Sequence, residues 1–225
     1  MVTIRICKYT KNFLKQLDET AEHLGDYINL YQIHSATFES GVLTNKQVHD
    51  ALAKCRQERN WSIGLSVSSP QQSDIIREAM KINVSPEGGG DELPLFDSVQ
   101  CTYNVLEQSP LQALQQAHER GMDIIIKEGL ANGRVLSNPA ILKYSKQLNC
   151  NPDTLALACI LAQTGFEPHV LSGAITPEQL VSNLDAIQIA ESKLKNDPEL
   201  LETIMNECIM DSNAYWSERS SLSWN

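Results

Sequence analysis

The chain has 225 residues, of which 42% are hydrophobic and 20% are charged, and these proportions allow a sizeable buried core. A formal net charge of -10 makes the chain a poor partner for nucleic-acid phosphates or anionic lipid, so we expect neither. No apolar run approaches the roughly 20 residues that span a bilayer. The first residues also lack a secretory apolar segment, which predicts a cytoplasmic protein.

Short apolar runs alternate along the chain with segments of helical periodicity. The runs are typical of buried strands, and apolar residues three and four apart mark the helices between them. The predicted strands start at Val2, Tyr27, Ser62, Phe96, Met122 and His169, and the predicted helices start near Phe13, Val48, Ile75, Leu111 and Leu155.

Capping residues and prolines mark the starts of the predicted helices. Gly25 and Gly121 are expected to end helices just before strands, and the stretch from Ser85 to Leu93 reads as a surface loop. The expected helix starts are Thr44 or Asn45 for the second helix, then Pro70, Pro110, Pro152 and Pro177.

The alternation of strands and helices predicts an α/β fold with a parallel sheet. We predict a partial (β/α)8 TIM barrel with about six of the eight parallel strands. An open doubly wound sheet is the alternative, although the Gly-rich first turn of that fold is absent. We predict a barrel domain over residues 1–189 and a C-terminal helical tail over 190–225 that packs on the barrel and holds a helix over Pro198–Met210.

Six cysteines are spread over the chain, and no two of them form a C-x-x-C pair. Because this spacing supports neither a zinc site nor a redox motif, we predict no metal centre. We expect most of the thiols to be buried and reduced.

Five segments at β/α spacing are similar to motifs of the aldo-keto reductase family. N-L-Y-Q-I-H resembles the family's D-L-Y-x-x-H strand, and I-G-L-S-V resembles its I-G-V-S-N. V-Q-C-T-Y-N resembles V-Q-x-x-Y-N, and I-I-K-E-G-L-A-N-G is similar to a V-I-x-S-P-L-A-x-G loop. The last resembles the G-A-x-x-P-E-Q-L-x-x-N-L phosphate segment. In order, the segments begin at Asn29, Ile63, Val99, Ile125 and Ser172.

The resemblance implies hydride transfer from NADPH to a small-molecule carbonyl substrate, with NADP(H) as cofactor. In this family a Tyr donates the proton, a Lys lowers the pKa of that Tyr, an Asp pairs with the Lys, and a His orients the carbonyl. His34 takes the His role by motif match, and Lys8, in a stretch that resembles the family's T-K strand end, takes the Lys role. The Tyr and the Asp come from an earlier segment in the family and have no counterpart after Met1, so we expect a barrel that lacks about two β/α units.

The resemblance also implies contacts to the cofactor. Ser66 and Gln100 would hydrogen-bond the nicotinamide carboxamide, and Leu130 and its neighbours would line the pyrophosphate. Glu128 would repel a pyrophosphate, and Lys127 would partly offset that charge. The adenosine end would lie at a helix start, where the matched residues are Gly173, Thr176, Gln179 and Asn183.

Three functions stay open at this point. The chain is either an NADP-dependent reductase of aldehydes or ketones, a non-catalytic NADP-binding or regulatory module, or a truncated product with little activity. A barrel that lacks strands leaves unpaired strand edges, which favours self-association. Ser66, Gln100, Gln179 and Asn183 also have an ordinary structural interpretation, as polar groups that satisfy strand ends or a helix surface.

Overall fold

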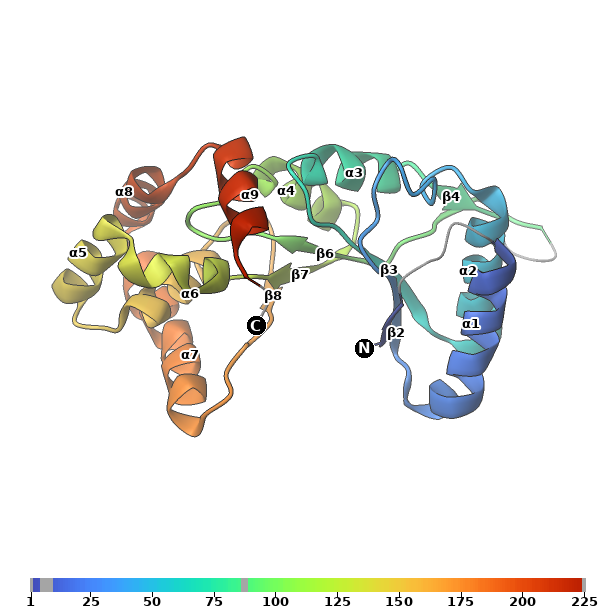
Figure 1. Ribbon diagram of the computed structural model, residues 1–225, viewed down its shortest axis with the longest axis horizontal. Helices are drawn as coiled ribbons and strands as arrows, with labels where there is room; N and C mark the ends of the chain where they lie inside the picture. Colours follow the sequence, from blue (N-terminus) through green and yellow to red (C-terminus); the bar gives the residue numbers. More distant parts are fainter. Residues whose placement is uncertain (1, 5–9, 86–88, 224–225) are drawn as a thin grey trace. The chain divides into compact units, whose positions relative to one another are not determined.

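A computed structural model describes residues 2–4, 10–85 and 89–223 (Figure 1). The chain divides into two compact units. The N-terminal unit holds Met1–Cys101 and Gln116–Asp123, and the C-terminal unit holds Thr102–Gln115 and Ile124–Asn225. None of the helices in the described ranges is both long enough and apolar enough to cross a membrane.

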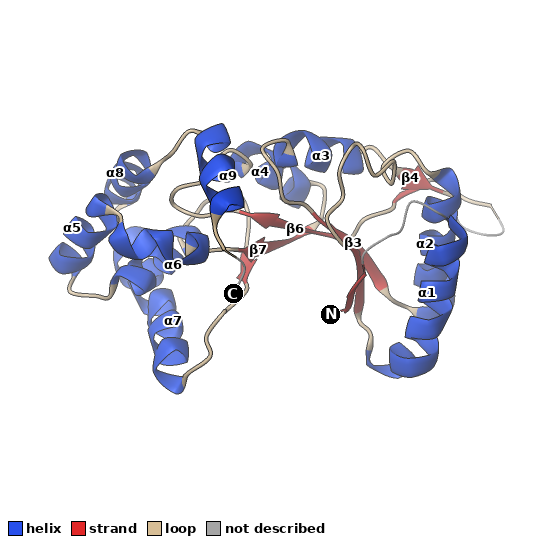
Figure 2. Cartoon of the chain, viewed as in Figure 1, coloured by secondary structure: helices blue, strands red, loops and turns tan. Residues whose placement is uncertain are grey.

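The N-terminal unit is built on a parallel sheet in the order β1-β2-β3-β6. Each of these four strands is followed by a helix in the sequence (Figure 2). The main elements of this unit are β1 (Val2–Ile4), α1 (Thr10–Leu24), β2 (Leu30–Ile33), α2 (Lys46–Arg59), β3 (Ser62–Ser66), α3 (Gln72–Ala79) and β6 (Ser98–Thr102).

A short antiparallel hairpin in the N-terminal unit was not predicted. β4 (Asn83–Val84) pairs with β5 (Leu93–Pro94), so the stretch predicted as a surface loop connects two strands. Only two residue pairs form the ladder, which is too short for alternation to show in the sequence.

The C-terminal unit holds the parallel pair β7 (Asp123–Lys127) and β8 (Pro168–Val170). Most residues of β7 are buried, as expected for a parallel strand with both faces covered. The described ranges therefore contain six strands with parallel partners, which confirms the predicted α/β class. The helices are α4 (Leu111–Glu119, shared with the other unit), α5 (Pro139–Leu148), α6 (Pro152–Leu161), α7 (Pro177–Ile189), α8 (Pro198–Cys208) and α9 (Ser212–Ser221).

Three short irregular helices complete the chain. A 3-10 turn, η1 (Gly25–Tyr27), separates α1 from β2, so Gly25 does not lead directly into a strand as predicted. A second, η2 (Ala131–Ser137), follows β7. A π-helical turn, η3 (Ala190–Leu194), continues α7 without a break.

Local capping explains where most helices begin. The Asn45 side chain accepts a hydrogen bond from the Val48 amide at the start of α2, and Thr176 caps α7 in the same way. Pro152 and Pro177 open their helices as predicted. The prediction was wrong for Pro70, because α3 begins at Gln72, and Pro110 lies immediately before α4 instead of inside its first turn.

The cysteines of the described ranges are free thiols, and most of them are buried, as predicted. Cys150 is half-buried at the end of α5. Burial raises the pKa of Cys159 in α6 and raises that of Cys208 in α8 to about 11. In the described part of the chain, no group of three His, Cys, Asp or Glu side chains is placed to hold a metal ion.

Candidate functional site

Three of the predicted site residues lie at the carboxyl ends of strands in the N-terminal unit. Ser66, the last residue of β3, is the register partner of Gln100, and Ile33, the last residue of β2, is the partner of Leu65, so His34 lies level with Ser66. Ser66 and Gln100 are buried, whereas His34 is exposed. The fold thus brings these three residues to one edge of the sheet, which is where chemistry gathers in β/α folds.

Ser66 holds the turn that follows β2. Its Oγ accepts a hydrogen bond of 3.0 Å from the Ser35 amide, and its carbonyl oxygen accepts one of 2.8 Å from the Ala36 amide. Ser35 has a φ of 52°, an uncommon value for a residue with a side chain. Both bonds therefore fix the chain immediately after His34 in one path.

Gln100 takes part in a similar backbone contact, in which its carbonyl oxygen accepts a hydrogen bond of 2.8 Å from the Val67 amide. Val67, which replaces the Asn of the family motif, is fully buried and apolar. Lys8, the other predicted catalytic residue, lies outside the described residues.

In the C-terminal unit, a cavity of about 270 Å³ forms between the loop after β7, the loop after β8 and the helices α6 and α7. Three predicted cofactor residues, Leu130, Gly173 and Asn183, line it. Lys127 is half-buried at the end of β7 and is not among the lining residues. The described residues that line it are Glu128, Gly129, Leu130, Asn132, Leu157, Leu171, Ser172, Gly173 and Asn183.

The other two predicted cofactor residues hold the loop before α7 in place. Thr176 Oγ1 accepts a hydrogen bond from the Gln179 amide, and Gln179 Oε1 accepts one of 2.8 Å from the Ile175 amide. Asn183 Nδ2 donates to Ser172 Oγ at 2.9 Å, which ties the cavity wall to α7. These side chains therefore shape the cavity, although Thr176 and Gln179 do not line it.

The start of α7 favours negative charge. The pKa of Glu178 is lowered because its carboxylate accepts hydrogen bonds from its own backbone amide and from Thr176. The sequence contains no Lys or Arg from Gln147 to Ser192. The first backbone N–H groups of α7 already have partners, because the Glu178 amide bonds its own carboxylate, the Gln179 amide bonds Thr176 Oγ1 and the Leu180 amide bonds the Thr176 carbonyl oxygen. The helix start would therefore act on an anion through the helix dipole.

An ion pair at the cavity was missed by the sequence analysis. Arg219 of α9 approaches Glu128 with 2.7 Å between Nη2 and Oε1. The two side chains are only 22% and 12% exposed. Glu128 therefore has a close cationic partner, and that partner is Arg219, where the sequence suggested Lys127.

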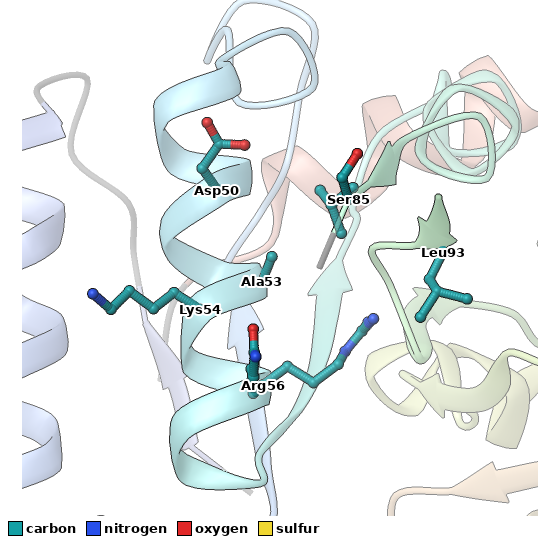
Figure 3. Close-up of a pocket in the computed structure, with 8 residues that line it drawn as sticks. Asp50, Ala53, Lys54, Arg56, Ser85 and Leu93 are labelled. Carbon is teal, nitrogen blue, oxygen red and sulfur yellow. The ribbon is translucent and has the colours of Figure 1, made fainter. Parts of the chain in front are cut away.

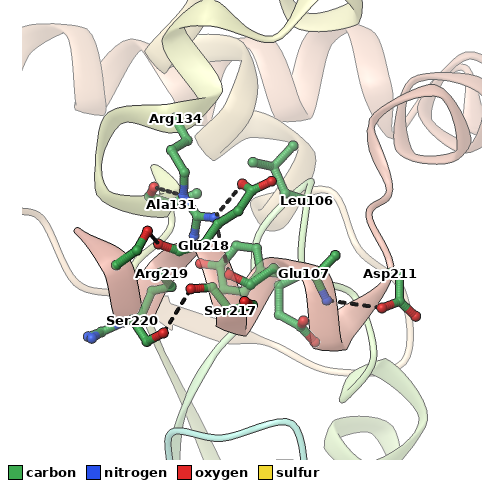
Figure 4. Close-up of polar contacts among 12 residues, drawn as sticks. Leu106, Glu107, Ala131, Arg134, Asp211, Ser217, Glu218, Arg219 and Ser220 are labelled. Atoms are coloured by element: carbon green, nitrogen blue, oxygen red, sulfur yellow. Dashed lines mark hydrogen bonds and ion pairs between the residues drawn. The ribbon is translucent and has the colours of Figure 1, made fainter.

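Further contacts fix α9 against the loops of this unit (Figure 4). Arg134 pairs with Glu218 at 3.4 Å and lies over the ring of Tyr215, 4.0 Å from its centroid. The Tyr215 hydroxyl accepts a hydrogen bond of 3.0 Å from Nδ2 of the buried Asn104 side chain. Asn104 is the last residue of the V-Q-C-T-Y-N motif, so the motif could have marked it as a candidate site residue. Tyr215, Glu218 and Arg219 of α9 belong to none of the motifs.

A separate cavity of about 500 Å³ lies in the N-terminal unit between α2 and the β4–β5 hairpin (Figure 3). Asp50, Lys54 and Arg56 reach it from α2, and Ser85 and Leu93 from the hairpin. None of the predicted site residues within the described ranges is among the residues that line this cavity.

The solved structures most useful for comparison are aldo-keto reductases. The holo form of an aldo-keto reductase from Bacillus halodurans matches with a TM-score of 0.64 at 18% identity, over 93% of this chain and 73% of that one. A thermostable aldo-keto reductase in complex with the inhibitor epalrestat matches with a TM-score of 0.62 at 21% identity, over 87% and 66%. An aldo-keto reductase from Klebsiella pneumoniae in complex with NADPH matches with a TM-score of 0.59 at 16% identity, over 87% and 63%.

These likenesses show that the chain has the fold of aldo-keto reductases, and they confirm the predicted partial barrel over the open-sheet alternative. The chain spans between 63% and 73% of the length of these three proteins. No protein-family profile matches the sequence, and no curated protein matches it.

Proposed function

We propose that the chain belongs to the aldo-keto reductases and works as an NADP(H)-dependent oxidoreductase on a small aldehyde or ketone. One observation carries this proposal. Leu130 of the loop after β7, Gly173 of the loop after β8 and Asn183 of α7, which the motifs assigned to the cofactor, line one cavity. The fold shared with aldo-keto reductases supports the same conclusion.

The residues of the C-terminal unit fit a dinucleotide phosphate. Gly173 leaves open space where a side chain would stand, the positive end of the α7 dipole follows the loop that carries Gly173, and Glu128 is paired with Arg219. We assign Lys127 and Leu130 to the pyrophosphate. Gly173, Thr176, Gln179 and Asn183 belong to the adenosine end in this assignment.

The residues of the N-terminal unit would serve the reacting end. Bound NADPH would supply the hydride. His34, exposed at the end of β2, would orient the carbonyl oxygen, and Lys8 would lower the pKa of the proton donor. Ser66 and Gln100 would hydrogen-bond the carboxamide. The matched segment contains no Tyr assigned as donor, and the proposal leaves that role unassigned.

Two glycine variants test cofactor binding. We expect Gly173→Asp to weaken NADPH binding at least about 10-fold, because it adds a negative charge to the cavity. The matched control is Gly173→Ala, since no heavy atom lies within 4 Å of a Cβ at this position. Titration of NADPH against each protein measures the effect, and equal binding by wild type and Gly173→Asp would remove the cavity as the cofactor site.

Turnover is tested separately. Wild type is expected to consume NADPH with at least one member of a panel of aldehydes, and His34→Ala should lose that activity without losing NADPH affinity. NADPH binding without any turnover would favour a second function, a non-catalytic NADP-binding module. One observation favours this alternative. The Ser66 hydroxyl, which the motif assigns to the nicotinamide carboxamide at the reacting end, already accepts a hydrogen bond from the Ser35 amide.

We also propose that two copies of the chain associate with each other. An apolar surface on α7 and the loop before it supports this idea, because surfaces of this kind are typical of interfaces. Replacement of Leu184 by Glu should shift the sedimentation profile towards monomer. The surface is made of Leu171, Ile175, Leu180, Val181, Leu184 and Ile187, each between 42% and 89% exposed.

Two further predictions stay open. We propose a cytoplasmic location, and the free thiols support it, since reduced cysteines are typical of that compartment. The domain boundary predicted between residues 189 and 190 also stays a prediction.

A further inference from the structure

We propose that Arg219 of α9 sets the charge of the cavity and thereby decides whether this site accepts a pyrophosphate. The inference rests on the proposed function, in which the cavity holds a dinucleotide. It concerns a residue that no motif assigns, in a helix that lies at the other end of the sequence from the matched strands.

The first step is the position of Glu128. Glu128 lines the cavity beside Gly129 and Leu130, and the Glu128 side chain is only 12% exposed. Its φ of 55° is a left-handed value, which the backbone bond from the Ala131 amide to the Glu128 carbonyl oxygen helps to hold. A carboxylate fixed in this place would repel an anion, and weak solvent screening would make the repulsion strong.

The second step is the geometry of the ion pair. Arg219 Nη2 lies 2.7 Å from Glu128 Oε1, and Arg219 Nε lies 3.4 Å from Oε2. Two donors of one guanidinium therefore face the two oxygens of one carboxylate. Such a side-on pair holds both groups in orientation and cancels the net charge at the cavity.

The third step is that α9 is held in place by contacts other than this pair. Arg134 bonds the Tyr215 carbonyl oxygen at 3.3 Å and the Glu218 carboxylate at 3.4 Å. Asn104 holds the Tyr215 hydroxyl. Removing either member of the Arg219–Glu128 pair therefore leaves α9 seated, and the remaining member keeps its charge at the cavity.

The inference makes two predictions of opposite sign. Arg219→Gln leaves an uncompensated carboxylate, so the affinity for NADPH should fall by about 10-fold or more. Glu128→Gln removes the negative charge and leaves the Arg219 guanidinium, so the affinity should rise several-fold. The double variant removes both charges and should bind NADPH within about 3-fold of wild type.

The experiment measures dissociation constants for NADPH and for inorganic pyrophosphate with wild type and all three variants, at low and high salt. Glu218→Gln is the matched control, because it breaks the neighbouring ion pair of the same helix away from the cavity lining and should leave both affinities unchanged. The differences among the variants should shrink as salt rises. Thermal melting of each variant shows whether α9 has stayed in place.

The outcomes separate the two proposals. If NADPH binds to wild type and the two single variants shift its affinity in opposite directions, the inference holds. If that pattern appears with pyrophosphate but NADPH does not bind to wild type, Arg219 does set the charge of the cavity and the cofactor proposal fails. If NADPH binds to wild type and both single variants weaken it alike, or neither changes it, the inference is overturned. Absence of binding by both probes overturns both proposals.

Discussion

The two units fix the loops at their strand ends in different ways. In the N-terminal unit the chain after β2 is held by Ser66, whose hydroxyl and carbonyl oxygens accept from amides of the neighbouring loop. In the C-terminal unit, side chains of α9 reach the loop after β7 through two ion pairs and a cation–π contact. The first arrangement depends mainly on the path of the backbone, and the second depends on which side chains the tail carries.

This difference indicates where substitutions should act. A side chain in the N-terminal unit can lose a polar group without opening a loop, because backbone bonds keep the loop in place. The loops of the C-terminal unit share their polar partners with α9, so one substitution removes several bonds at once.

The largest effect is expected for Asn104→Ala in the C-terminal unit. Asn104 is fully buried, and its amide donates to the Glu128 carbonyl oxygen at 2.9 Å and to Tyr215. Its Oδ1 accepts from the Leu106 and Glu107 amides. Loss of this side chain leaves several buried polar groups without partners, so the free energy of unfolding should fall by about 3 kcal/mol or more.

Urea unfolding measures that change, and the exposed substitution Gln147→Ala serves as the control. A loss below about 1 kcal/mol for Asn104→Ala would show that the network does not hold the loops in the way we describe.

The second prediction concerns high pH. Burial raises the pKa of Tyr215 to about 12, an effect that the hydrogen bond from Asn104 opposes. The unfolded chain then releases this proton near pH 10, before the folded chain does, so the stability should fall as pH rises above about 10 and level off near 12. The shift corresponds to about 2 to 3 kcal/mol.

Tyr215→Phe should remove this part of the pH dependence, whereas wild type should keep it. Denaturant unfolding between pH 9 and 11.5 provides the measurement. Parallel curves for the two proteins would show that the hydroxyl does not titrate differently on folding.

The third prediction compares one chemical change in both units. The Tyr31 hydroxyl is fully buried and has no hydrogen-bond partner within the described ranges, and its ring stacks on Trp61 with 5.6 Å between centroids. Tyr31→Phe should therefore leave stability unchanged or raise it by up to about 1 kcal/mol. Tyr215→Phe should lower it by about 1 kcal/mol at neutral pH, because Asn104 loses an acceptor.

Equal melting temperatures or unfolding midpoints for the two Tyr→Phe variants would erase the contrast between the units. A marked loss in Tyr31→Phe would mean that its hydroxyl has a role that the stacking contact does not explain.

The smallest effect is expected at His49 in the N-terminal unit. Burial lowers the pKa of His49, and its Nε2 lies 2.7 Å from the Val42 carbonyl oxygen. The unfolded chain therefore takes up this proton at a higher pH than the folded chain. Stability from neutral His49 should be fully present above about pH 6.5 and be lost as pH falls further.

His49→Gln keeps a donor for Val42 but does not titrate, so its melting temperature should change less between pH 7 and 5 than that of wild type. If the two proteins lose stability alike over this interval, His49 is not the residue responsible.

The sequence predicted the six parallel strands and most of the helices between them in the right order, but not the β4–β5 hairpin or α5. Periodicity located β3, β7, α1 and α2, because continuous apolar runs and residues three to four apart are dictated by local geometry. The motifs also indicated which loops would meet: Leu130 and Gly173 do line one cavity. For α5, the pair Asn138–Pro139 repeats the device seen at Asn151–Pro152 and was an overlooked signal.

The tail contacts could not be predicted from local sequence. Arg219 and Glu128 are 91 residues apart, and Asn104 and Tyr215 are 111 apart. A charged residue on a short helix is ordinarily solvated, and nothing in its neighbours indicates a distant partner. The charge of the cavity is therefore set by tertiary packing, which explains why Lys127 was the expected partner of Glu128.

Because the thiols of the C-terminal unit are buried to different degrees, their labelling rates can report opening motions of its helices in solution. Only a thiolate reacts with an alkylating reagent, and burial disfavours that form at Cys150, Cys208 and Cys159. Half-buried Cys150 should be modified first, while fully buried Cys159 reacts only in molecules where α6 has moved away from its neighbours. The labelling rate at Cys159 therefore reports how often the wall of the cavity opens.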